Sequence, residues 1–127
     1  MSVLVVDDHS DARMLVERML EGSGAEILLA ASAKRALDIC KRQKIDILIS
    51  DLGMPEMDGL EMIRQMRARE DGRSLMAIAV TAFAHLEDRQ AALRQGFDFL
   101  ATKPVDAGEL MLLVGKCVSR LRRHIQK

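Results

Sequence analysis

The sequence predicts an α/β fold, a doubly wound parallel sheet with helices on both faces. Strand-like and helix-like patterns alternate along the chain, as they do in successive βα units. The run VLVV at residues 3–6 is β-branched, apolar on both faces and too short for a typical helix, which favours a buried parallel strand. Asp7 and Asp8 follow this run, and Asp51 follows a similar run at residues 45–50.

The first half of the chain also predicts two helices and one more strand. Apolar residues repeat at helical spacing over residues 12–20, and the glycines of residues 22–24 end that helix. A strand is expected at residues 25–30. Ser32 is expected to cap a second helix, which ends near residues 41–42, where the helix dipole favours the basic side chains found there.

The second half repeats the alternation, and two of its three helices are preceded by an Asp-x-x-Glu pattern that is typical of a capping box. The predicted elements are a helix from Asp58 to near Gly72, a strand at residues 75–80 ended by Thr81, a helix at residues 84–95 closed by Gly96, a strand at residues 97–101 and a last helix after Asp106. Five βα units in this order predict a flavodoxin-like sheet with strand order 2-1-3-4-5.

Composition limits the architecture and the partners. At 127 residues and 49% hydrophobic content, residues 1–127 are expected to form a single domain with no output domain. Basic and acidic residues both number 19, and no apolar stretch reaches the length of a membrane span, so no direct nucleic-acid or membrane contact is expected. Cys40 and Cys117 form no Cys-x-x-Cys pair, and the first strand leaves no room for a signal sequence, so a cytoplasmic location is expected.

Five polar residues at strand ends are expected to face one crevice, because ligands of an open parallel sheet bind beyond the carboxyl ends of its strands. They are Asp7, Asp8, Asp51, Thr81 and Lys103. The carboxylates repel one another unless a cation lies among them, and Mg²⁺ prefers such oxygens and often binds phosphate as well. Lys103 adds a positive charge and Thr81 a hydroxyl, so the predicted ligand is a phosphoryl group.

Four motifs, VVDD at residues 5–8, DLGMPEMDG at 51–59, VTA at 80–82 and TKP at 102–104, resemble the receiver domain of two-component response regulators. The match spans nearly the whole chain. The resemblance implies a phosphoacceptor switch of a phosphorelay, in which Asp51 takes a phosphoryl group from a histidine kinase or a histidine phosphotransfer protein in the presence of Mg²⁺. It implies an autocatalytic phosphoacceptor and not a turnover enzyme.

The resemblance also implies a role for each site residue. Asp51 is expected to be the nucleophile. The expected direct Mg²⁺ ligands are Asp8, Asp51 and the backbone carbonyl of Gly53, with Asp7 acting through a metal-bound water. The expected phosphoryl-binding groups are the Lys103 side chain, the Thr81 hydroxyl and the Ala82 backbone N–H. Movement of Thr81 onto the phosphoryl group is the implied switch.

The output side is expected on the face spanning Ala84–Lys116, where a downstream partner would bind. In the family, an aromatic residue three positions before the lysine usually rotates inward with the threonine, but here that position is Leu100, flanked by Phe97 and Phe99. The segments TAF and GFDFLATKPVD resemble receivers attached to hybrid sensor kinases. Gly53 and Phe83 offer no side chain to hold an attacking water, so slow self-dephosphorylation is expected.

Two other classes of function stay open. One is a pseudo-receiver that acts as a non-phosphorylated interaction module, which absence of Mg²⁺ binding would favour. The other is a small-molecule phosphatase or mononucleotide-binding protein, but the chain has no glycine-rich phosphate loop and Asp51-Leu52-Gly53 lacks a second aspartate. The three histidines, at positions 9, 85 and 124, lack metal-ligand spacing, so none is predicted to be a ligand.

Overall fold

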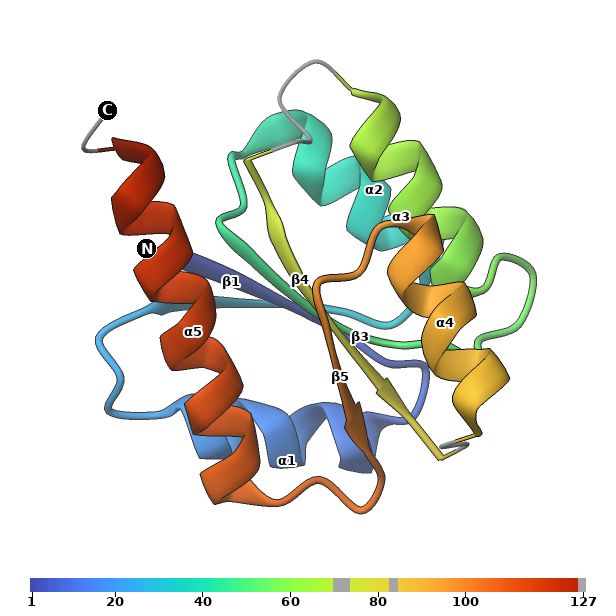
Figure 1. Ribbon diagram of the computed structural model, residues 1–127, viewed down its shortest axis with the longest axis horizontal. Helices are drawn as coiled ribbons and strands as arrows, with labels where there is room; N and C mark the ends of the chain where they lie inside the picture. Colours follow the sequence, from blue (N-terminus) through green and yellow to red (C-terminus); the bar gives the residue numbers. More distant parts are fainter. Residues whose placement is uncertain (70–73, 83–84, 126–127) are drawn as a thin grey trace.

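The computed structural model describes residues 1–69, 74–82 and 85–125. Its five strands form one parallel sheet in the order β2-β1-β3-β4-β5, which confirms the predicted order (Figure 1). The strands are β1 (Ser2–Val6), β2 (Glu26–Ala30), β3 (Ile47–Asp51), β4 (Met76–Thr81) and β5 (Phe99–Thr102). β1, β3 and β4 are buried along their whole length, which explains their apolar character on both faces.

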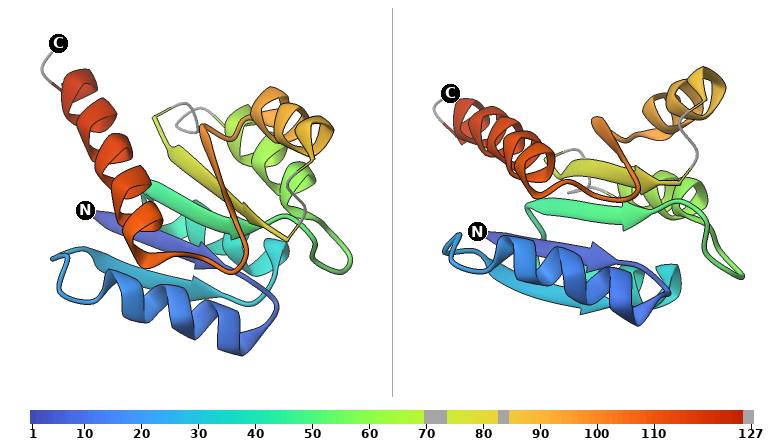
Figure 2. Two further views of the ribbon diagram at one scale, coloured as in Figure 1. Left: turned by 60° about the horizontal axis from the view of Figure 1, so that its bottom comes forward. Right: turned by 90° about the horizontal axis from the view of Figure 1, so that it is seen from below.

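Helices cover both faces of the sheet (Figure 2). One face carries α1 (Ser10–Leu20) and α5 (Ala107–Ile125), and the other carries α2 (Ala33–Arg42), α3 (Gly59–Ala68) and α4 (Leu86–Gln95). Alternate strand residues supply the two cores, with Leu4 and Leu48 facing α2–α4 and Val3 and Ile49 facing α1 and α5. Full burial of each such side chain contributes about 1.5–3 kcal/mol to the stability of the fold. Because the residues alternate in direction, the same strands stabilise both helix layers.

Side-chain caps begin three of the helices where the sequence predicts them. Ser32 Oγ accepts a hydrogen bond from the Arg35 backbone N–H at 3.1 Å. Asp58 Oδ1 accepts from Glu61 N–H at 2.9 Å, and Asp106 Oδ2 accepts from Glu109 N–H at 2.8 Å. Each cap satisfies one of the free N–H groups of a first turn and is typically worth about 1 kcal/mol.

Two predicted strand starts were wrong, because residues near them form hydrogen bonds outside the sheet instead. β3 begins at Ile47 and not at residue 45, since Asp46 uses its carboxylate to accept from the Ser2 backbone N–H at 2.9 Å. β5 begins at Phe99 and not at residue 97, since the Phe97 N–H still donates to Ala92 O at the end of α4. Both strands therefore start two residues late.

The helix bounds also differ from the prediction at two places. α3 ends at Ala68, before the predicted stop near Gly72, which lies outside the described residues. α4 begins at Leu86, and the predicted first residue, Ala84, also lies outside them. Gly96 closes α4 as predicted, with a φ of +130° that favours glycine.

Arg67 of α3 ties the α4–β5 connection to the rest of the fold. Its guanidinium donates to Gly96 O at 2.8 Å and to Asp98 Oδ2 at 2.9 Å. The same carboxylate oxygen accepts from the Ala77 backbone N–H of β4 at 2.8 Å. Within the described ranges, no helix is both long enough and apolar enough to cross a membrane.

Candidate functional site

The strand register brings the predicted site residues to one edge of the sheet. Val6 of β1 pairs with Ser50 of β3, so Asp7 and Asp51 leave neighbouring strands at the same level. Asp51 in turn pairs with Val80 of β4, one residue before Thr81. The carboxyl ends of the central strands therefore lie together, and the predicted aspartates lie at this edge.

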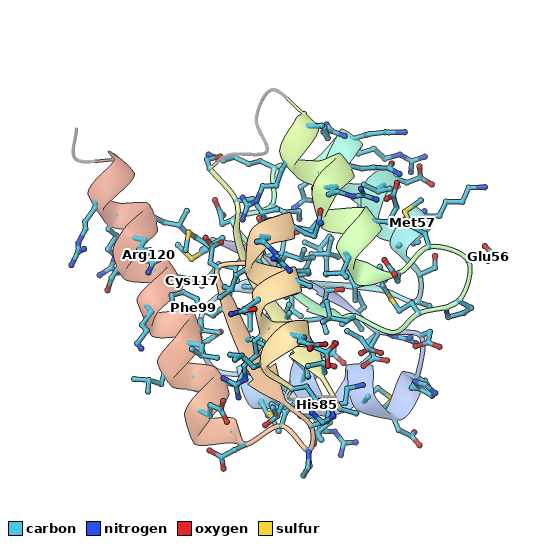
Figure 3. All side chains as sticks on the ribbon, turned by 45° about the vertical axis from the view of Figure 1, so that its right-hand side comes forward. Glu56, Met57, His85, Phe99, Cys117 and Arg120 are labelled. Carbon is cyan, nitrogen blue, oxygen red and sulfur yellow. The ribbon has the colours of Figure 1, made fainter. Side chains whose placement is uncertain are left out.

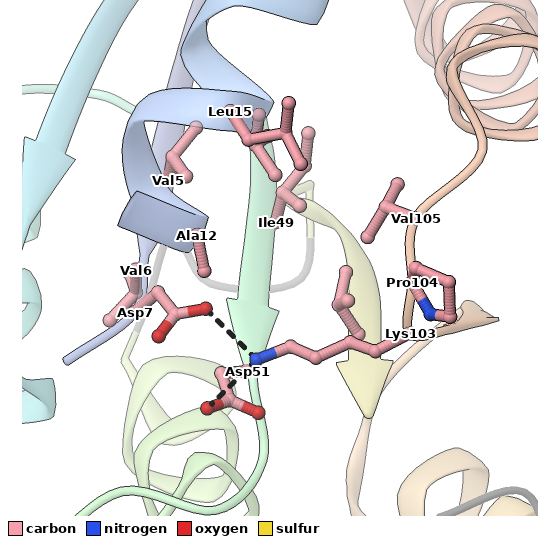
Figure 4. A pocket seen from close by; sticks show the side chains of 12 residues that line it. Val5, Val6, Asp7, Ala12, Leu15, Ile49, Asp51, Lys103, Pro104 and Val105 are labelled. Atoms are coloured by element: carbon pink, nitrogen blue, oxygen red, sulfur yellow. Dashed lines mark hydrogen bonds and ion pairs between the residues drawn. The ribbon is translucent and has the colours of Figure 1, made fainter. Parts of the chain in front are cut away.

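Lys103 follows β5 and reaches across this edge to two carboxylates (Figure 4). Its Nζ lies 3.2 Å from Asp7 Oδ2 and 3.5 Å from Asp51 Oδ2. The side chains of Asp7 and Asp51 are only 8% and 9% exposed. The Lys103 backbone N–H also donates to Thr81 O at 2.8 Å, which fixes the start of the β5–α5 connection against β4.

Burial and the charge of Lys103 determine the electrostatics of the Asp7, Asp51 and Lys103 cluster. Burial raises the pKa of the Asp51 carboxyl above its usual 3.8, and nearby Asp7 raises it further, while the charge of Lys103 only partly opposes both. Burial alone would lower the pKa of Lys103, but its hydrogen bond to Asp7 and the charge of Asp51 outweigh that effect and raise it. Asp51 is thus a poorly solvated carboxyl next to a firmly protonated lysine.

Among the residues that the structure describes, four side chains at this edge could hold a metal ion. Asp7, Asp8, His9 and Asp51 each offer one ligand atom, and these atoms lie within 4.8 Å of one another. Asp8 Oδ1 is buried and accepts no hydrogen bond from any described residue. A buried carboxylate oxygen without a donor is costly unless a cation satisfies it. The three carboxylates therefore fit the oxygen-rich donor set that Mg²⁺ prefers.

The loop from β3 to α3 closes tightly on Asp51. Gly59 N–H donates to Leu52 O at 2.9 Å, and a Cβ at residue 59 would lie 2.6 Å from Asp51 O. Only glycine fits this close approach without a backbone shift. The Gly53 backbone hydrogen bond to Asp51 acts to lower the pKa of that carboxyl. Gly53, a predicted metal ligand through its carbonyl, is thus held beside Asp51.

Thr81 and Ala82 lie at the same edge of the sheet. Thr81 is the last residue of β4 and is buried, and it pairs with Thr102 of β5. Ala82 follows it and is exposed. Phe83, which bears on the predicted rate of dephosphorylation, lies outside the described residues.

Two residues that sequence analysis did not select also contact the site. The Arg13 side chain donates to the Asp7 backbone carbonyl at 2.8 Å, which links α1 to the end of β1. His9 Nδ1 lies 3.2 Å from Asp8 Oδ1 and 3.5 Å from Asp7 Oδ1. No motif spacing singles out Arg13, whereas the position of His9 directly after Asp8 was an available signal.

A cavity of about 140 Å³ opens beside the carboxylates (Figure 4). Its walls are mostly apolar and include Ala12 and Leu15 of α1 and Pro104 and Val105 after β5. Leu15 is 48% exposed. Asp51 therefore lies next to an apolar rim that includes Leu15 and Pro104 and is partly exposed.

The aromatic residue of β5 lies on the other side of the sheet from Leu100. Leu100 is half-buried and packs with the core under α2–α4. Phe99 faces α5, where Arg120 lies 4.7 Å from its ring centroid (Figure 3). Lys116 lies 5.9 Å from the same centroid. These cation–π contacts stabilise Phe99 on the α5 side. The aromatic side chain of β5 therefore packs on the face opposite Leu100, whereas Phe97, which precedes β5, packs in the same core as Leu100.

The model of the response regulator receiver domain family matches residues 3–115. The chain therefore belongs to the response regulator receiver domain family. Receiver domains are signalling modules that accept phosphoryl groups and interact with histidine kinases or phosphotransfer proteins, and they are not conventional enzymes. They bind Mg²⁺ in general, which agrees with the acidic cluster of this site.

Relatives of this chain include short and long proteins. A 14.6 kDa protein in the sodA1 3′ region of Leptolyngbya boryana is 52% identical over 90% of this chain and 87% of its own length. The DNA-binding transcriptional regulator NtrC of Klebsiella pneumoniae is 36% identical over 96% of this chain, which spans 26% of NtrC. The sensor histidine kinase RcsC of Salmonella typhi is 35% identical over 97% of this chain, which spans 13% of RcsC.

Solved structures share the fold. A CheY-like response regulator receiver domain protein from Methanospirillum hungatei JF-1 superposes with a TM-score of 0.88 at 25% identity, over 97% of each chain. A response regulator receiver protein from Pseudomonas putida gives 0.83 at 34% identity, over 91% of this chain and 95% of that one. Both likenesses confirm the predicted flavodoxin-like receiver fold.

Proposed function

We propose that this domain is a phosphorelay switch in which Asp51 accepts a phosphoryl group from a phosphohistidine of a histidine kinase or a histidine phosphotransfer protein. The observation that carries the proposal is the position of Lys103, whose Nζ lies 3.5 Å from Asp51 Oδ2. A fixed cation beside a poorly solvated carboxylate suits the binding of an incoming anionic group.

The chemical step uses Asp51 as the nucleophile. A carboxylate oxygen of Asp51 attacks phosphorus, the P–N bond to the partner imidazole breaks, and its electron pair leaves with the imidazole nitrogen. Lys103 binds one phosphoryl oxygen, and the Ala82 N–H binds another. The Thr81 hydroxyl then moves to donate to the phosphoryl group. Catalysis of this kind depends mainly on positioning and on neutralisation of charge.

The acidic cluster would hold the Mg²⁺ that the family implies. Asp8, Asp51 and the Gly53 carbonyl would be direct ligands, with Asp7 acting through a bound water, and the orphaned Asp8 Oδ1 supports this assignment. The ion would supply positive charge against the phosphoryl oxygens. The raised pKa of Asp51 supports the same role, because an added cation favours the charged carboxylate.

We extend the proposal to partners and to output. The kinase or phosphotransfer protein would approach at the apolar rim formed by Leu15 and Pro104, beside Asp51. A downstream partner would bind the face that spans Ala84–Lys116. We place the domain in the cytoplasm and treat the chain as one receiver domain. We also propose slow self-dephosphorylation, because neither Gly53 nor Phe83 carries a side chain that could hold an attacking water.

Intact mass after incubation with acetyl phosphate and Mg²⁺ tests this proposal. We expect one phosphoryl adduct on the wild type, and none after chelation or in Asp51→Asn. Asp58→Asn is the matched control, because Asp58 is exposed and caps α3 outside the site, and it should be modified like the wild type. A wild type that stays unmodified by both acetyl phosphate and a phosphohistidine donor would instead support the pseudo-receiver alternative.

A further inference from the structure

We propose that His9 is an additional metal ligand, so that this site binds a divalent transition ion such as Ni²⁺ more tightly, relative to Mg²⁺, than an all-oxygen site does. The inference rests on the metal site of the proposed function and deepens it. It concerns the ion that the site selects. Asp8, Asp51 and the Gly53 carbonyl supply the direct oxygen ligands, Asp7 acts through a bound water, and the imidazole Nδ1 of His9 adds a nitrogen.

The distances in the cluster suit atoms that share one ion. Neighbouring ligands of an octahedral ion with bonds of about 2.1 Å lie about 3.0 Å apart. His9 Nδ1 lies 3.2 Å from Asp8 Oδ1 and 3.5 Å from Asp7 Oδ1. All the ligand atoms, including that of Asp51, lie within 4.8 Å of one another. The imidazole is thus close enough to the three carboxylates to bind the same ion.

The contact between His9 and Asp8 leaves room for an ion to bridge them. Asp8 Oδ1 is buried and receives no hydrogen bond from the described part of the chain, although His9 Nδ1 is 3.2 Å away. Two polar atoms that approach this closely without hydrogen-bond geometry are both open to a shared cation.

Apart from its contacts to Asp7 and Asp8, the His9 side chain makes no hydrogen bond or ion pair among the described residues. It stands at the N-cap of α1 but makes no side-chain capping hydrogen bond, and it is 73% exposed. Its backbone N–H donates to Asp7 Oδ1 at 2.9 Å, which fixes the main chain while leaving the ring able to turn. Binding of an ion would therefore cost little rearrangement of the fold.

A nitrogen ligand changes which ion the site prefers. Mg²⁺ is a hard cation that favours oxygen and keeps its water, whereas imidazole suits Ni²⁺, Co²⁺ and Zn²⁺. Affinity for such sites generally rises from Mn²⁺ to Cu²⁺. Removal of the imidazole should therefore weaken the binding of Ni²⁺ strongly and that of Mg²⁺ little.

Calorimetric titration of the metal-free protein with Ni²⁺ and, separately, with Mg²⁺ at pH 7.5 tests the inference. His9→Ala is expected to weaken Ni²⁺ binding about tenfold or more and to change Mg²⁺ binding less than about twofold. His85→Ala is the matched control, because His85 is also exposed at a helix N-cap without a side-chain cap, and it should change neither. Asp8→Asn should weaken the binding of both ions.

Zn²⁺ titration of protein labelled with ¹⁵N-histidine adds a direct readout, because a bound Nδ1 changes its chemical shift. We expect that change at His9 and not at His85. Equal affinities of wild type and His9→Ala for Ni²⁺, an equal loss in His85→Ala, or Ni²⁺ binding that survives in Asp8→Asn would each overturn the inference. If the wild type bound Mg²⁺ in any of these cases, the proposed function would stand. If the wild type bound neither ion, the metal site of the proposed function would be contradicted as well.

Discussion

Lys103 is the residue on which the site depends most. It lies between two carboxylates that are less than one-tenth exposed, and it partly offsets the cost of burying their charges. It does not offset that cost fully for Asp51, because burial is the largest effect on this carboxyl and leaves its pKa raised. The site is therefore short of positive charge, which favours the binding of a cation.

The raised pKa of Asp51 has a consequence for stability. A carboxyl with a higher pKa in the folded chain than in the unfolded chain stabilises the fold at pH values below its unfolded pKa. That contribution is lost as the pH rises through the folded pKa. In metal-free buffer at pH 7, Asp51→Asn is expected to raise the free energy of unfolding by about 1 kcal/mol. Lys103 keeps Asp7 as a partner in this variant, so no buried cation is left alone.

Urea unfolding as a function of pH measures this effect. The gain from Asp51→Asn should shrink as the pH falls toward 3.8, where Asp51 of the wild type becomes neutral as well. Asp58→Asn should change stability little at any pH, because asparagine caps a helix about as well as aspartate. A loss of stability in Asp51→Asn at pH 7 would contradict the account.

The connection between β3 and α3 shows how an element positions Asp51. Asp58 caps α3, and Gly59 lets the first turn approach the backbone of Asp51. We expect Gly59→Ala to lower the free energy of unfolding by about 1–3 kcal/mol, because its Cβ would overlap Asp51 O. It should also slow phosphorylation, since the carboxylate would shift with its backbone.

Gly115→Ala is the control for this change. Gly115 is an exposed helical residue of α5, and a Cβ there meets nothing within 4 Å. Alanine should stabilise this helix by about 0.5–1 kcal/mol and leave phosphorylation unchanged. Thermal unfolding and the rate of adduct formation measure both variants. Equal responses of the two would mean that residue 59 is not under steric constraint.

Local sequence patterns predicted how helices begin better than where strands begin. The caps at Ser32, Asp58 and Asp106 depend on contacts within four residues, which a sequence reveals directly. The residues just before β3 and β5 bond instead to partners far along the chain. Asp46 bonds to Ser2, and Asp98 bonds to Arg67, so neither partner is visible in the local pattern.

At the scale of the whole molecule, strand alternation was enough to predict the sheet order and the edge at which the site lies. A parallel sheet brings the carboxyl ends of its strands together, so Asp7, Asp51 and Lys103 could be grouped from sequence. The pairing itself could not be, because Lys103 and Asp7 are 96 residues apart and no local rule fixes which carboxylate a lysine reaches. The approach of Arg13 to the same edge likewise depends on the folded position of α1.

The sheet should be most resistant to opening at its centre. β1, β3 and β4 pair on both sides and are buried throughout, whereas β2 and β5 pair on one side and are partly exposed. We expect amide hydrogens of β3 to exchange at least about tenfold more slowly than those of β5. Exchange followed by NMR measures this. Equal protection of β3 and β5 would contradict this view of the fold.

The most direct test of the central claim locates the phosphoryl group on the chain. Sodium borohydride reduces an aspartyl phosphate to homoserine, and tandem mass spectrometry of the digested protein then identifies the modified position. After treatment with a phosphodonor and Mg²⁺, the account predicts homoserine in place of Asp51 alone. Homoserine in place of Asp7 or Asp8, or at no position even with a phosphohistidine donor, would contradict it.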